Sequence, residues 1–145
     1  MTAISIMIEG QDGLTWPRWK RLAEAVERLG YAGLFRSDHF TNAGPPDKES
    51  LELVVSLAYL ASSTSRMHFG SLVAPFSFRD PAMLARQAAA IDDLSAGRLI
   101  LGSARAGTRA STRCSAMRLA ISPHVWRACR RGSRWSRGCC AAMSR

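Results

Sequence analysis

The chain has 145 residues, a hydrophobic fraction of 47% and a formal net charge of +9. This length is enough for one modest domain with a core. The sequence contains no apolar stretch of about 18 residues that would indicate a membrane span. The amino terminus lacks the basic start and long apolar segment of a signal peptide, so a cytoplasmic protein is expected.

The charge is distributed unevenly along the chain. Residues 1–93 contain seven Arg, two Lys and all 11 acidic residues, whereas residues 94–145 contain 11 Arg and neither Lys nor acidic residues. The four cysteines, Cys114, Cys129, Cys139 and Cys140, also lie in the second part. A change this sharp indicates that the two parts differ in origin or in role.

Strand and helix patterns alternate through the first hundred residues. Short apolar, β-branched-rich runs predict strands, and they occur at 3–9, 32–38, 66–74 and 98–102. A first helix is expected between Thr15 as N-cap and Gly30, and a second over 51–63. Asp80 as N-cap, with a proline after it, opens a third helix, which Gly97 is expected to close.

The order β-α-β-α-β-α-β predicts a parallel sheet with right-handed crossovers. Two architectures fit: an open doubly wound sheet, and the N-terminal half of a (β/α)8 TIM barrel. No G-x-G-x-x-G follows the first strand, which disfavours a dinucleotide-binding version. In both architectures ligands bind at the carboxyl ends of strands, which here are residues 9–13, 37–40 and 72–78.

Two adjacent polar residues, Asp38 and His39, end the second predicted strand. Neighbours on extended backbone point to opposite sides, so one side chain can face a pocket while the other braces its rim. Histidine titrates near neutral pH and can move a proton. The alternative is that Asp38 caps a turn and His39 lies on a solvated loop. His68 is expected mid-strand, in packing or at the surface, and Arg79 is an anion contact or, more commonly for such an Arg, solvated.

Two long stretches, GYAGLFRSDHF and SRMHFGSLVAPFSFRDPAMLARQAAAIDDLSAGRLILG, resemble the N-terminal part of the luciferase-like monooxygenase superfamily, in the branch that uses coenzyme F420 or FMN. With the opening strand, the resemblance covers residues 1–102. It implies the first half of a TIM barrel, cofactor at the carboxyl ends of the strands, and oxidation or reduction of a small organic substrate. Full-length relatives often dimerise, and neither a specific nucleic acid nor a membrane is an expected partner.

The resemblance also assigns roles to residues. Asp38 would contact the cofactor, and His39 would be the acid/base beside its reactive ring, as in the F420-type members. Leu72, Val73 and Ala74 would lie at a bulge after the third strand, where the family often has a non-prolyl cis peptide behind the ring. The cofactor would carry out the hydride or oxygen chemistry, and the protein would orient and shield it.

Residues 103–145 form an Arg- and Cys-rich tail that is expected to be irregular, and three interpretations compete for it. A nucleic-acid arm would use its arginines with Trp126 and Trp135, but it contains no lysine. A metal site would use the cysteines with His124, but the usual C-x-x-C knuckles are missing, so no metal is expected. The third interpretation is a shifted reading frame.

The shifted frame is supported by the genetic code. After GRLILG the family usually continues LGAGWN, whereas this chain reads SARAGT. GC-rich codons for SARAGT, read one nucleotide earlier, encode LGAGWN, and the following residues become an acidic, amphipathic helix pattern. We therefore predict a single-base deletion or sequencing error near the Gly102 codon. The chain would then be a truncated half-barrel, inactive by itself.

Overall fold

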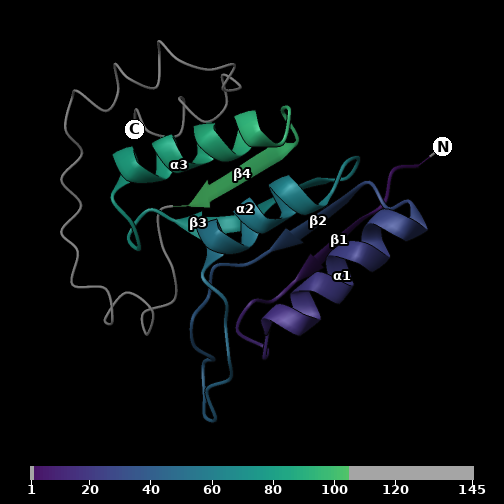
Figure 1. The fold of residues 1–145 in the computed structure, drawn as a ribbon. Helices are drawn as coiled ribbons and strands as arrows, with labels where there is room; N and C mark the ends of the chain where they lie inside the picture. The colour runs from purple at the N-terminus through teal and green to yellow at the C-terminus, as the bar shows by residue number, and fades with distance from the viewer. Residues whose placement is uncertain (1, 105–145) are drawn as a thin grey trace.

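Four parallel strands form one sheet in the order β1-β2-β3-β4 (Figure 1). The structure, a computed structural model, describes residues 2–104. The strands are β1 (Ser5–Ile8), β2 (Gly33–Arg36), β3 (His68–Pro75) and β4 (Leu99–Ala104). The order never reverses within these residues, unlike that of a doubly wound sheet. The fold therefore matches the first half of a TIM barrel, as predicted.

Two of the three helices begin where the sequence places their caps, and the second begins two residues later than expected, after Glu52 as its cap. They are α1 (Trp16–Leu29), α2 (Leu53–Ser63) and α3 (Pro81–Leu94). The side chain of Thr15 accepts a hydrogen bond from the Arg18 backbone at 3.4 Å, and that of Asp80 accepts one from the Met83 backbone at 2.9 Å. These bonds satisfy N–H groups that a helix leaves unpaired in its first turn.

Two local predictions are wrong. Gly97 does not close α3: the helix ends at Leu94 with Ser95 as its cap, and Ala96 and Gly97 follow with φ of 56° and 83°. Two residues beyond the cap are therefore needed to reverse the chain into β4. His68 is the first residue of β3 and is exposed, so it is not mid-strand. It lies at the amino end of the sheet.

The hydrophobic core lies between the sheet and the helices. Leu34 of β2 and Phe69 of β3 are fully buried there, against Trp19 of α1 and Leu57 of α2. Residues on the opposite face, such as Met7 and Ile100, are 40% and 49% exposed, and no element within residues 2–104 covers them. The sheet is therefore buried on one face only. None of the helices in residues 2–104 has the length and apolarity needed to cross a membrane.

Glu27, on the last turn of α1, holds the turn that leads into β3. Its carboxylate accepts hydrogen bonds from the backbone N–H groups of Ser65, Arg66 and Met67, at 3.2, 2.7 and 3.3 Å. Burial alone would raise the pKa of Glu27, but these bonds outweigh it and leave the pKa below its ordinary value of 4.5. The ionised carboxylate thus stabilises the fold.

A Glu27→Gln variant tests this contribution through its pH dependence. A carboxyl whose pKa is lowered by folding stabilises the fold above its unfolded pKa, and this stabilisation is lost as the pH falls. We expect the wild-type protein to be more stable than the variant at neutral pH, and the difference to shrink below pH 4.5. Urea unfolding across this range measures it, with exposed Glu24→Gln as the control. A difference that is constant with pH would contradict the assignment.

Candidate functional site

The candidate site lies at the carboxyl end of the sheet, where β2 ends beside Ser71 and β3 continues to Pro75. Arg36 pairs with Ser71 across the two strands, so the segments that follow leave the sheet at the same edge. The end of β1 joins them, because the Gly10 backbone donates a hydrogen bond to Ser37 Oγ at 3.0 Å. The three strand ends predicted to bind a ligand are therefore neighbours, as expected for parallel strands.

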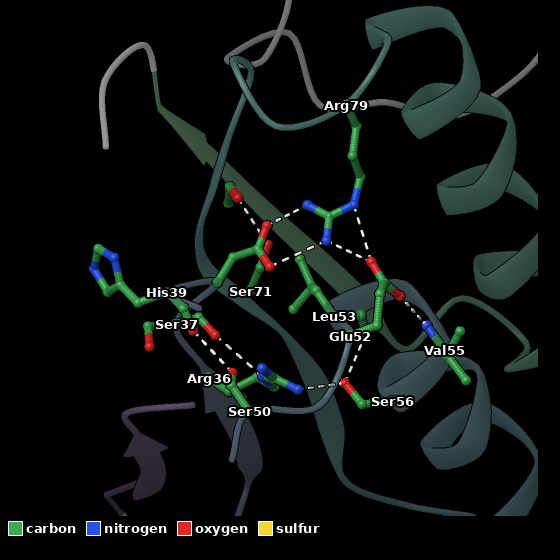
Figure 2. A network of polar contacts seen from close by, with 12 residues as sticks. Arg36, Ser37, His39, Ser50, Glu52, Leu53, Val55, Ser56, Ser71 and Arg79 are labelled. Atoms are coloured by element: carbon green, nitrogen blue, oxygen red, sulfur yellow. Dashed lines mark hydrogen bonds and ion pairs between the residues drawn. The ribbon is translucent and has the colours of Figure 1, made fainter. Parts of the chain in front are cut away.

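An ion-pair network built on Arg79 occupies this edge (Figure 2). The guanidinium donates from Nη1 and Nη2 to the two carboxylate oxygens of Asp38, and from Nε and Nη2 to Glu52 Oε1. Burial raises the pKa of Asp38, and Arg79 only partly offsets this effect. The expectation that Arg79 is solvated is wrong, because its side chain is only 13% exposed.

Arg36, beneath this network, is a fully buried cation that the sequence analysis missed. It donates to Leu51 O at 2.7 Å, to Ser56 Oγ at 2.9 Å and to Ser37 O at 3.1 Å. Burial lowers the pKa of Arg36, and the nearby charges of Asp38 and Glu52 only partly offset this effect. These bonds tie the end of β2 to the start of α2. A charged residue inside the apolar run of a strand was the available signal.

The tight fit around Arg36 explains the glycine at the end of β1. A Cβ on Gly10 would lie 2.4 Å from Arg36 Nη2 and 3.0 Å from Ser37 O. A Cβ atom essentially never comes as close as 2.4 Å to another heavy atom, so a side chain at this position would displace Arg36. Gly10 thus lets the chain pass directly over the buried guanidinium.

His39 is partly buried, and in Figure 2 its ring points away from Arg79. Its backbone carbonyl accepts a hydrogen bond from Ser50 Oγ at 2.9 Å. The next residue, Phe40, stacks on Phe78 with 5.1 Å between ring centroids. The Asp38 side chain, in contrast, is fully buried in the ion-pair network. Asp38 and His39 therefore have different surroundings, as their alternation along extended backbone predicts.

The peptide bond between Leu72 and Val73 is cis, at the position to which the family resemblance points. The pairing of β3 with β4 shifts register between Ser71 and Ala74, so the irregularity lies within β3 rather than after it. Ser71 Oγ bridges it by donating to Gly102 O at 2.7 Å. The Leu72 side chain is 53% exposed, whereas Ala74 is buried.

Other predicted features do not join this site. His68 lies at the opposite end of β3. A groove of ≈ 510 Å³ includes Lys20, Tyr59 and Arg66, and one of ≈ 450 Å³ includes Trp16, so neither reaches Asp38 or His39. Residues 2–104 hold no cluster of His, Cys, Asp or Glu arranged to bind a metal. The tail cysteines, Trp126, Trp135 and His124 lie outside the described residues.

Comparisons with known proteins agree with this geometry. The family model described as luciferase-like monooxygenase matches residues 2–118. The 4-hydroxyprotoasukamycin monooxygenase of Streptomyces nodosus subsp. asukaensis is 35% identical over 94 residues, which are 64% of this chain and 24% of that protein. The matched segment therefore spans about a quarter of this curated relative.

Solved structures show the same fold. A riboflavin lyase bound to modified FMN and riboflavin matches with a TM-score of 0.67 and 17% identity, over 86% of this chain and 34% of that one. An F420-dependent secondary alcohol dehydrogenase in complex with an F420–acetone adduct matches with a TM-score of 0.67 and 14% identity, over 88% and 38%. These structural neighbours use FMN or F420. The family match, which covers most of the sequence, shows that this chain belongs to the luciferase-like monooxygenase family of enzymes.

Proposed function

We propose that residues 2–104 supply one side of the active site of an FMN- or F420-dependent oxidoreductase that acts on a small organic substrate. One observation carries the proposal: Asp38, His39 and residues 72–74 lie together at the carboxyl ends of neighbouring parallel strands. When bound there, the cofactor would supply the hydride transfer or oxygen chemistry. The comparisons support both cofactors and do not choose between them.

The surroundings of His39 and of residues 72–74 fit a planar redox cofactor, whereas the Asp38 side chain is fully buried. The exposed Leu72 side chain offers an apolar contact for the ring of the cofactor. Val73 and Ala74 belong to the same irregular segment of β3. His39 would exchange a proton with the reacting centre, because its imidazole is directed away from the ion pairs. Asp38 is the proposed polar contact, although both of its oxygens already accept hydrogen bonds from Arg79.

We further propose that this 145-residue chain binds the cofactor weakly and has no activity by itself. The described sheet has two edge strands, β1 and β4, that each pair on one side only, and its second face is uncovered. Phosphate groups in TIM barrels are commonly held by loops after the seventh and eighth strands. Stoichiometric binding of FMN or F420 by the purified chain, followed by fluorescence, would refute this proposal.

The shifted reading frame is proposed as the origin of the tail. Resequencing the DNA around the Gly102 codon is expected to reveal one missing base, whose insertion opens a frame that begins LGAGWN. The family match runs past residue 102, to residue 118. The DNA sequence is therefore the measurement that decides whether the reading frame shifts near the Gly102 codon. If the sequence is confirmed as written, the frame proposal fails, and salt-dependent DNA binding by residues 103–145 becomes the next measurement.

The protein with the restored frame tests the role of His39. We expect His39→Gln to lower kcat by about 10²–10⁴-fold, the usual contribution of a general acid or base, with cofactor still bound. His68→Gln is the matched control, since that histidine is exposed at the far end of β3. Equal activity of the two variants would remove His39 from the mechanism.

A further inference from the structure

Arg79 connects three parts of the fold at the candidate site. It lies between β3 and α3, whereas Asp38 follows β2 and Glu52 caps the start of α2. The distance from Nη2 to Asp38 Oδ1 is 3.1 Å, and that from Nε to Glu52 Oε1 is 3.0 Å. The guanidinium thus contacts both carboxylates, and Figure 2 shows its bonds to Glu52. One side chain therefore fixes the relative positions of segments up to 41 residues apart in sequence.

The burial of these charges makes Arg79 the principal partner of Asp38. The side chains of Asp38, Arg79 and Glu52 are 0%, 13% and 44% exposed. A buried carboxylate needs a charged or hydrogen-bonding partner, and removal of one member of such a pair leaves the other unpaired. The other nearby cation, Arg36, directs its guanidinium to neutral acceptors. Loss of Arg79 would therefore release or neutralise Asp38.

His39 is held from two sides through its backbone. Asp38, the preceding residue, is fixed by Arg79, and the His39 carbonyl is fixed by Ser50 Oγ. Among the hydrogen bonds within residues 2–104, none involves the His39 imidazole. The position of the ring therefore depends on the backbone that carries it. A change at Arg79 can reach this backbone through Asp38, which precedes His39, or through Phe40, which follows it and whose ring centroid lies 5.9 Å from the Arg79 guanidinium carbon.

We propose that Arg79 is a positioning residue for His39 and acts through its bidentate ion pair with Asp38. The inference rests on the proposed function insofar as His39 exchanges a proton in catalysis. The placement of the ring is a separate property of the free protein, and it can be measured without cofactor. The two proposals can therefore fail independently.

The test is a comparison of imidazole proton resonances by NMR in the 145-residue protein. We expect Arg79→Gln to shift the His39 resonance, with that of His68 unchanged as a report on the intact fold. Arg86→Gln, an equal change at an exposed position of α3, should leave both resonances in place. A His39 resonance that is the same in Arg79→Gln as in wild-type would overturn the proposal.

Two further variants separate positioning from general destabilisation. In an Asp38→Asn background, Arg79→Gln should add no further shift of His39, because the intermediate partner is gone. An additive shift would show that Arg79 acts by another route and would refute the proposal. If Arg79→Gln does not fold, Arg79→Lys decides: a lysine cannot reproduce the bidentate pair, so an unmoved His39 resonance would again overturn the inference.

The catalytic consequence is tested in the protein with the restored frame. We expect Arg79→Lys to lower kcat with little change in KM, and Arg86→Lys to change neither. A resonance shift of His39 without loss of activity in His39→Gln would contradict the proposed function but not the positioning. Activity that depends on His39, with no resonance shift in either Arg79 variant, would contradict the positioning alone.

Discussion

Replacement of Trp19 by alanine is expected to lower the free energy of unfolding by about 3–5 kcal/mol, the usual cost of truncating a large buried aromatic residue. The Trp19 side chain is 0% exposed at the centre of the core. Its Nε1 donates to Ser56 O at 3.0 Å, so the variant also loses the bond that joins α1 to α2. A domain is typically stable by about 5–15 kcal/mol, so this loss removes much of the total.

Urea unfolding followed by far-UV circular dichroism measures the effect. Trp16→Ala is the matched control on the same helix, because Trp16 is 36% exposed and its ring makes an edge contact with Tyr59 at 5.8 Å between ring centroids. We expect a cost of about 0.5–1.5 kcal/mol for the loss of that aromatic pair. Similar costs for the two variants would contradict the placement of Trp19 in the core.

A Gly70→Ala variant is expected to disrupt the pairing of β3 with β4. A Cβ at residue 70 would lie 1.7 Å from Ile100 O and 2.6 Å from the carbonyl carbon of the same residue. These are backbone atoms of the paired strand, so no side-chain rotation relieves the clash. The cost should therefore exceed the about 1–3 kcal/mol that is typical of overpacked cores.

Soluble yield and the far-UV spectrum report on this prediction. Gly30→Ala is the control: its φ is +76°, but nothing lies within 4 Å of the added Cβ. The left-handed backbone alone should cost about 1–2 kcal/mol, which leaves a folded protein. A Gly70→Ala protein as stable as Gly30→Ala would show that the two strands are not paired as described.

Local sequence signals predicted most of the fold. The starts of two helices are marked by Thr15 and Asp80, whose side chains cap backbone N–H groups. The end of α1 is marked by Gly30, which adopts a positive φ. The first two predicted strands were longer than the observed ones, since apolar runs continue past the last ladder pair, whereas β3 and β4 run past their predicted ends. The end of α3 was missed because Ser95 and Ala96 carry no strong stop signal, whereas the following glycine does.

The site was only partly predictable. The strand-end rule placed Asp38 and His39 at the carboxyl end of the sheet, because topology alone decides where parallel strands end. The roles of Arg36 and Arg79 were missed, since their partners are distant in sequence and depend on how β2, β3 and α2 pack. An arginine before a helix looks the same in sequence whether it is solvated or enclosed by two carboxylates.

The one-sided burial of the sheet has a consequence for synthesis on the ribosome. Each strand and the helix after it bury their apolar side chains against near neighbours in sequence, so this layer can form as soon as it emerges. The face that carries Met7 and Ile100 gains no cover from those same residues. During translation this apolar face of the nascent chain would stay exposed, and chaperones that recognise apolar segments would bind to it.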